Sequence, residues 1–317
     1  MATLREAAET ILCQCLAVRA GEPVLVVDDR RAGALATAFS EMAAEMGAEP
    51  LVIEMRPRAR NGEEPPGPVA AAMRAAAVVV APTSRSLTHT QARREACAAG
   101  ARVASMPGVT EAMLQRAIVL DYEAMARRCE QVAEALTHGR EARLFTPRGT
   151  DLRVQMGERQ GIPDTGLLRR PGDYGNLPAG EAFIAPLEGT AEGILIVDAS
   201  LAGLGMLDEP IALTILAGSI AEVRGGAAAE QFRATLDQVG PRARVLCELG
   251  VGANERARVT GVVLEDEKVL GTVHIAFGNN VGFGGVNDAP FHVDGVVTAP
   301  TLVVDDEVLI DAGAPRF

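Results

Sequence analysis

Two of the four histidines in this chain lie close together in one glycine-rich segment. His274 belongs to LGTVHIAFG, and His292 is followed two residues later by Asp294 in FHVDG. Side chains two residues apart on a β-strand point to the same face, so His292 and Asp294 would project together. An imidazole beside a carboxylate is a common half-site for Zn, Mn, Co or Fe. The alternative is a half-buried histidine that is satisfied by the neighbouring carboxylate.

Two glutamates occupy positions where an isolated acid is unusual. Glu181 follows a Pro-Ala-Gly turn in NLPAGEAFIAP and comes directly before an apolar strand, so it is either an exposed turn residue or a ligand. Glu248 lies inside the apolar strand RVLCELGVG, between Cys247 and Leu249. Burying an unpaired carboxylate there would be costly or would shift its pKa. A metal ion would remove that cost, and an arginine partner would do the same.

Between the two histidines lies a run with almost no charge, NNVGFGGVN. Its glycines allow the connector to fold back closely, so that His274 and His292 could reach the same point. Asn279, Asn280 and Asn287 are candidates for hydrogen bonds to a substrate. The alternative role of asparagine in such a segment is to form turns.

These residues must be positioned by the strands and helices that the rest of the pattern predicts. In the first half, continuous apolar runs alternate with helical segments, which is typical of a parallel sheet buried on both faces. The predicted strands are residues 23–29, 50–55, 76–82 and 101–108, and the predicted helices are about 32–46, 68–76, 87–99 and 122–137. No GxGxxG follows the first strand, so a dinucleotide site is not indicated. We expect an α/β domain over residues 1–139.

The second half, residues 140–317, has the pattern of an α+β domain with a mixed, largely antiparallel sheet. Hairpins are predicted at 141–157, 210–226 and 301–313, further strands at 193–203, 243–254, 270–278 and 291–297, and helices at 227–239 and 256–268. The charged run LEDEK, residues 264–268, is typical of a solvated helix face. The candidate residues Glu248, His274, His292 and Asp294 all fall on these predicted strands.

Composition narrows the class of partner. A net charge of −12 argues against nucleic acid and against anionic membrane surfaces, which both require clustered Lys and Arg. The five cysteines form no CxxC pair, so neither a zinc ribbon nor a thioredoxin-type site is indicated, and free thiols suggest a reducing compartment. No apolar run reaches the roughly 18 residues of a membrane span, and no secretion signal is evident. We expect a cytoplasmic protein with a small-molecule or short-peptide substrate.

The order of motifs NLPAGE, CELGVGAN, EDEKVLGTVHIAFGNN, FGGVN and FHVDGVV resembles the M29 family of metallopeptidases, the AmpS/AmpT-like thermophilic aminopeptidases. The resemblance covers the C-terminal half, and the α/β first half is compatible with it. It implies that Glu181, Glu248, His274, His292 and Asp294 are the five ligands of a centre with two Zn, Co or Mn ions. It also implies a homodimer with an internal active-site cavity.

The resemblance implies a hydrolase in which a metal-activated water attacks an amide or peptide bond. Glu181 would then act as general base and Glu248 would bridge or complete the metal shell. Family peptidases carry a tyrosine shortly after the histidine equivalent to His274, whereas the only tyrosines here are Tyr122 and Tyr174.

The same superfamily includes 2,5-dihydroxypyridine 5,6-dioxygenases, which open an aromatic ring at a single Fe(II). In that alternative His274, His292 and Asp294 would hold the iron. Glu181 and Glu248 would be acid–base groups or hydrogen-bond partners of the ligands. A third possibility is a metal-binding protein without catalytic turnover.

Overall fold

The computed structural model describes residues 2–29 and 33–317, which form two compact units. The first unit consists of Met1–Glu123 and Gly166–Ala179, and the second of Ala124–Thr165 and Gly180–Phe317. The chain therefore returns to the first unit after leaving it. The sequence predicts a single division at residue 139. This boundary stays a prediction, because a division into compact units does not show which segments fold independently.

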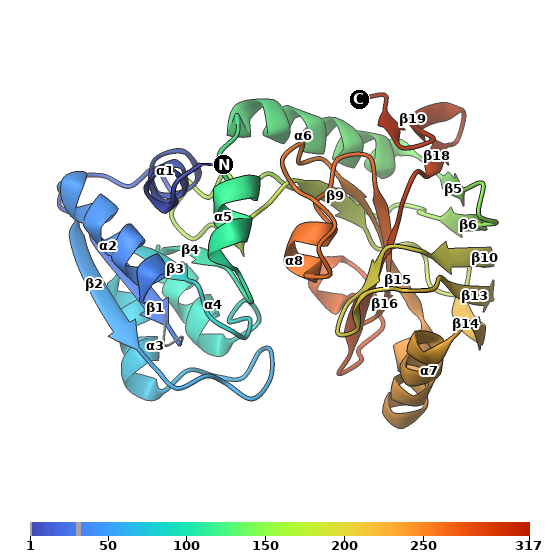
Figure 1. The fold of residues 1–317 in the computed structure, drawn as a ribbon, viewed down its shortest axis with the longest axis horizontal. Helices are drawn as coiled ribbons and strands as arrows, with labels where there is room; N and C mark the ends of the chain where they lie inside the picture. Colours follow the sequence, from blue (N-terminus) through green and yellow to red (C-terminus); the bar gives the residue numbers. More distant parts are fainter. Residues whose placement is uncertain (1, 30–32) are drawn as a thin grey trace. The chain divides into compact units, whose positions relative to one another are not determined.

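The first unit contains a five-stranded parallel sheet, which confirms the predicted α/β class (Figure 1). Its strands are β1 (Pro23–Asp28), β2 (Glu49–Glu54), β3 (Val78–Ala81), β4 (Arg102–Ser105) and β8 (Tyr174–Asn176), in the order β2-β1-β3-β4-β8. Every neighbouring pair is parallel. The fifth strand, β8, was not predicted. It is short and polar, and it lies far along the chain from the apolar repeat that identified the other four.

Helices cover the parallel sheet. They are α1 (Leu4–Thr10), extended by a π-helical turn over Ile11–Cys15, α2 (Ala34–Glu45), α3 (Gly67–Ala75), α4 (Gln91–Ala98) and α5 (Glu111–Ala117). The strand order reverses direction after β2, so right-handed crossovers place α2 on one face and α3 and α4 on the other. No helix within the described residues is long and apolar enough to cross a membrane.

The second unit is built on two antiparallel sheets, as the predicted hairpins require. The eight-stranded sheet has the order β14-β13-β10-β6-β5-β18-β19-β20, and the seven-stranded sheet has the order β12-β11-β17-β16-β15-β9-β7. The strands of the first sheet are β5 (Glu141–Phe145), β6 (Asp151–Gln155), β10 (Glu192–Val197), β13 (Ile211–Leu216), β14 (Ser219–Arg224), β18 (Thr301–Val304), β19 (Glu307–Asp311) and β20 (Ala314–Pro315). Those of the second are β7 (Ile162–Asp164), β9 (Glu181–Ile184), β11 (Ser200–Leu201), β12 (Gly205–Met206), β15 (Leu246–Gly252), β16 (Val273–Gly278) and β17 (His292–Val297). The helices are α6 (Tyr122–His138), α7 (Ala227–Val239) and α8 (Val263–Asp266).

One face of the seven-stranded sheet packs into the apolar core of this unit. Leu249, Val251, Val273 and Ile275 belong to that core, together with Leu195 and other residues of the eight-stranded sheet. Because side chains alternate along a strand, the intervening residues project from the opposite face. Glu248 and His274 are among these, so the apolar residues pack between the two sheets and the titratable residues lie together on the opposite face of the seven-stranded sheet, where both are buried.

The predicted helix over residues 256–268 is wrong except for the short α8. The prediction that residues 264–268 form a solvated face is also wrong, because Glu265, Asp266 and Lys268 are almost completely buried. The Glu265 carboxylate accepts the backbone N–H of Arg258 at 3.0 Å. The Asp266 carboxylate accepts the N–H of Gly261 at 2.8 Å. These acids hold an irregular segment by accepting its backbone N–H groups, which is why a charged run is buried here.

Candidate metal centre

Three adjacent strands place two of the candidate carboxylates, Glu248 and Asp294, in one cross-strand row. In the antiparallel register Glu248 of β15 pairs with Ala276 of β16, and Ala276 pairs with Asp294 of β17. The small Ala276 side chain therefore lies between two carboxylates on the same face. A β-bulge interrupts the β15–β16 register between Leu246 and Glu248. Such bulges re-aim side chains near functional sites, and this one sits directly beside Glu248.

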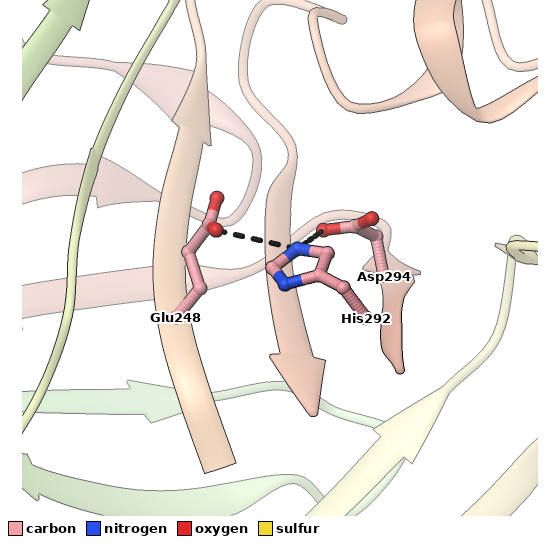
Figure 2. Close-up of side chains that lie close together, drawn as sticks. All are labelled: Glu248, His292 and Asp294. Carbon is pink, nitrogen blue, oxygen red and sulfur yellow. Dashed lines mark ion pairs between the residues drawn. The ribbon is translucent and has the colours of Figure 1, made fainter. Parts of the chain in front are cut away.

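Glu248, His292 and Asp294 converge tightly, as Figure 2 shows. One ligand atom from each of these residues lies within 4.8 Å of the others. Nε2 of His292 is 3.5 Å from Oε2 of Glu248 and 3.4 Å from Oδ1 of Asp294. The two carboxylates are buried, whereas the side chain of His292 is 33% exposed. The group can therefore hold a cation and still be reached from outside.

The tautomer of His292 follows from its other ring nitrogen. Nδ1 lies 2.8 Å from the backbone oxygen of Asn279. A carbonyl oxygen can only accept, so Nδ1 carries a proton. Asp294 raises the pKa of His292, so without a metal ion Nε2 is also protonated between Glu248 and Asp294, and a metal ion would take the place of that proton. A metal-binding histidine is commonly oriented by donating its second N–H to a carbonyl. The Sγ of Cys247 also lies 3.7 Å from Nδ1.

His274 and Glu181 extend the centre on its inner side. His274 is fully buried, and its Nε2 lies 3.3 Å from Oε1 of Glu248 and 3.3 Å from Oε2 of Glu181. Gly250 makes room for this imidazole, because a Cβ at that position would collide with the His274 ring. Glu248 therefore contacts both histidines, and all five predicted residues fall in one connected cluster.

Lys268 is the residue of this cluster that the sequence analysis missed. Its ammonium lies 2.5 Å from Oε1 of Glu181, 2.8 Å from Oε1 of Glu267 and 3.4 Å from Oδ2 of Asp164. Its side chain is 1% exposed. The sequence did place Lys268 in the charged run EDEK, a few residues before the strand that carries His274. The high charge of this run favoured the prediction of a solvent-exposed helix face.

The charges of the buried groups depend strongly on one another. Burial raises the pKa of Glu181 to about 8, although the Lys268 ammonium opposes this shift. Burial by itself would lower the pKa of His274, but Glu248 and Glu181 together raise it to about 9. Burial likewise opposes ionisation of Asp294, and the His292 imidazole still lowers its pKa to about 2. The carboxylates therefore favour positive charge at the centre, either on protonated imidazoles or on a metal ion.

Several observations fit a divalent cation. Neither Oε2 of Glu181 nor Nδ1 of His274 has a hydrogen-bond partner among the residues that the structure describes, although both atoms are buried. Within the described ranges, Glu248 forms ion pairs with the two histidines and not with an arginine. Imidazole and carboxylate are the donors that Fe, Mn, Zn and Co accept. The ligand roles of the five residues remain predictions, with Glu248, His292 and Asp294 forming the most compact set.

The three asparagines use their amides inside the glycine-rich loop. Asn280 is fully buried and donates to Glu188 at 2.8 Å. Asn279 donates to Asp288 at 3.2 Å, and Asn287 donates to the oxygen of Gly278 at 2.6 Å. These contacts correspond to the turn-forming alternative, and substrate binding by the three residues stays a prediction.

The resemblance stated from the sequence is confirmed: the chain matches the family of 2,5-dihydroxypyridine 5,6-dioxygenases, and its fold is shared with AmpT. The family model of NicX, 2,5-dihydroxypyridine 5,6-dioxygenase, matches residues 3–316, so the chain belongs to this family. The 2,5-dihydroxypyridine 5,6-dioxygenase of Pseudomonas putida KT2440 is 26% identical over 200 residues, which are 59% of this chain and 57% of that protein. The chain thus matches less than two thirds of that relative's length.

Two solved structures share the fold. A 2,5-dihydroxypyridine dioxygenase from Pseudomonas putida KT2440 superposes with a TM-score of 0.83 at 21% identity, over 98% of this chain and 96% of that one. AmpT from Thermus thermophilus superposes with a TM-score of 0.74 at 22% identity, over 99% of each chain. The comparisons therefore favour the dioxygenase alternative of the sequence analysis over the aminopeptidase that it placed first.

Proposed function

We propose that this protein is an iron(II)-dependent dioxygenase that opens a dihydroxylated aromatic ring of the dihydroxypyridine type. The observation that carries the proposal is the NicX family match over residues 3–316, which spans both units and all candidate ligands. The lack of any tyrosine after Tyr174 agrees with it, because the related peptidases carry one shortly after the residue equivalent to His274.

Glu248, His292 and Asp294 would hold the metal ion, with His274 adjacent through Glu248. A set of imidazole and carboxylate ligands with open positions is typical of non-haem Fe(II) oxygenases. The bound iron would supply the redox chemistry by which O₂ and an aromatic diol react. The side chain of His292 is 33% exposed, and we expect the substrate to approach the centre from this side.

Glu181 is the group of this chain that is suited to move a proton. Its Oε1 is fixed by the Lys268 ammonium at 2.5 Å, while Oε2 faces His274 without a hydrogen-bond partner among the described residues. With a pKa of about 8, the carboxyl can gain or lose a proton near neutral pH. We assign to Glu181 the removal of a proton from a substrate hydroxyl group, and to Lys268 the orientation of Glu181.

A second candidate function is an aminopeptidase-like metallohydrolase. The observation in its favour is that His274 lies 3.3 Å from both Glu181 and Glu248, so that a second ion would have ligands of its own. Two ions would activate a water for attack on an amide bond. The number of ions per chain and the source of the oxygen in the product separate the two functions.

The direct test uses purified protein loaded anaerobically with Fe(II), and oxygen uptake is followed after addition of 2,5-dihydroxypyridine. The proposal expects oxygen uptake with loss of the ring absorbance, and none from a His292→Ala variant that folds normally. Release of amino acids from short peptides by the Zn- or Co-loaded protein, without oxygen uptake, would favour the hydrolase instead.

A further inference from the structure

We propose that Glu188 and Arg159, which are not metal ligands, set the orientation of His292 by holding the glycine-rich loop 279–291. The inference rests on the proposed function only in taking His292 as a metal ligand. Glu188 and Arg159 are therefore assigned as positioning residues, and neither is expected to contact the substrate.

The Glu188 carboxylate receives donors from several directions. Its Oε1 accepts from Nδ2 of Asn280 at 2.8 Å and from the backbone N–H of Val286 at 2.8 Å. Its Oε2 accepts from Nη2 of Arg159 at 2.7 Å. Arg159 also donates through Nη1 to the backbone oxygen of Gly284. The Glu188–Arg159 ion pair thus binds the loop near its start, at Asn280, and again near its middle, at Gly284 and Val286.

Asn280 is the residue around which the loop folds. Its side chain is fully buried, and its Oδ1 accepts the backbone N–H of Asn287 at 2.9 Å. Its backbone oxygen accepts the N–H of Gly285 at 2.9 Å. A Cβ at Gly285 would collide with the Asn280 amide, so glycine is required for this close approach. The position of Asn280 is therefore fixed both by hydrogen bonds and by steric fit.

The link from Asn280 to His292 is one rigid peptide unit. The carbonyl of Asn279 and the N–H of Asn280 belong to the same planar group, so they turn together. That N–H donates to the backbone oxygen of Asn287 at 3.2 Å, and the carbonyl accepts Nδ1–H of His292 at 2.8 Å. Moving Asn280 would rotate the carbonyl away from His292 and release the imidazole from its orientation.

Apolar packing holds this loop only in part. Phe283 packs edge-on against Phe183 and against the ring of His292. Val281 is 52% exposed and Val286 is 75% exposed, so the segment around them has little apolar packing.

Burial alone would raise the pKa of Glu188, but its hydrogen bonds from Val286 and Asn280 and the nearby Arg159 keep the pKa below the usual range. The carboxylate is therefore ionised at neutral pH, and the Glu188–Arg159 pair constrains the part of the loop where Val281 and Val286 are exposed.

The test measures Co(II) affinity, by competition with a chelating dye, and the visible absorption spectrum of the Co(II) protein. Glu188→Gln removes the ion pair, and Gly285→Ala displaces Asn280 without changing any charge. Asp305→Asn is the matched control for the first. Asp305 also accepts backbone N–H groups, including that of Glu141 at 3.0 Å, but it lies in the turn between β18 and β19 of the eight-stranded sheet. Gly282→Ala is the control for the second, since its Cβ would meet open space.

We expect both test variants to bind Co(II) about 10-fold or more weakly and with an altered spectrum, which is the usual effect of disturbing a ligand's hydrogen-bond partner. Both controls should match the parent protein. Folded test variants with the parent's affinity and spectrum would overturn the inference, and one folded variant is enough to decide it. If the parent protein itself bound no Co(II), the proposed function would fail instead.

Discussion

At the scale of single residues, Lys268 is the least expected member of the site. It is a buried ammonium in contact with three carboxylates, those of Glu181, Glu267 and Asp164. Removing one partner of a buried charged cluster leaves the others uncompensated, which is more destabilising than the net contribution of the cluster suggests. Lys268 therefore supports both the stability of the second unit and the ionisation of Glu181.

Lys268→Met should lower the free energy of unfolding by about 3 kcal/mol, as measured by urea denaturation at neutral pH. The loss should be larger at alkaline pH than at neutral pH. The pKa of Glu181 is about 8 with the ammonium present and higher without it, so the two proteins bind different numbers of protons only above about pH 8. The loss should therefore shrink as the pH falls toward 8 and level off below it. A loss that stays constant between roughly pH 7 and 10, or that grows toward acid pH, would contradict this role for Lys268.

The protonation of His274 predicts how metal affinity depends on pH. In the metal-free protein the pKa of His274 is about 9, since its carboxylate neighbours outweigh burial. Below that pH the imidazole of His274 carries a second proton, which must be released before the site can hold a cation with full affinity. Affinity for Co(II) should therefore rise by up to about tenfold per pH unit for each proton released, and it should level off toward pH 9. A dissociation constant that does not change between roughly pH 6 and 8 would show that no such proton is released.

At the scale of elements, the site depends on small residues in the strands beneath it. Ala276 separates Glu248 from Asp294 within one cross-strand row, and Gly250 lies under the His274 ring. Larger side chains at these positions would occupy the space in which the ligands meet. The seven-stranded sheet thus contributes to the site through the side chains that it lacks as well as through those that it presents.

Gly250→Ala should displace the His274 imidazole, because the added Cβ would collide with it. We expect the affinity for the metal ion to fall roughly 10-fold or more, which is the usual effect of changing residues that orient metal ligands. Isothermal titration with Co(II) measures the change. Gly67→Ala is the control, because its added Cβ meets open space. Equal affinities for the two variants would mean that His274 needs no such room.

The same elements show how far the sequence alone could lead. The periodic apolar strands, including those of Glu248, His274 and His292, were predicted close to their observed bounds, because their alternation reports directly which face is buried. Their pairing follows from long-range packing and could not be inferred from periodicity. The burial of residues 264–268 was missed for a related reason: their partners, Glu181, Asp164 and the backbone near Gly261, are distant in sequence or lie in irregular structure.

Within the candidate site, the residue types were predictable and their arrangement was not. His292 and Asp294 could be paired from their spacing alone, since residues two positions apart on one strand point to the same face. That Glu248 contacts both histidines depends on the β15–β16–β17 register and on a bulge. The orientation of His292 by the carbonyl of Asn279 depends on how the loop folds, which no local pattern specifies.

At the scale of the whole molecule, the family match extends across both units. Similar folds occur in a dihydroxypyridine dioxygenase and in AmpT, so the fold by itself does not choose between ring opening and hydrolysis. The predicted homodimer remains a prediction. The choice of chemistry depends on the metal that the centre holds and on where the oxygen atoms of the product originate.

Isotope labelling under ¹⁸O₂ tests that choice most directly. Iron-loaded protein is incubated with 2,5-dihydroxypyridine in ¹⁸O₂ and ordinary water, and the product is analysed by mass spectrometry. The dioxygenase account predicts that both atoms of one O₂ molecule enter the ring-opened product. A product whose new oxygen comes only from water, with no ¹⁸O incorporated from the gas, would contradict it and indicate hydrolysis.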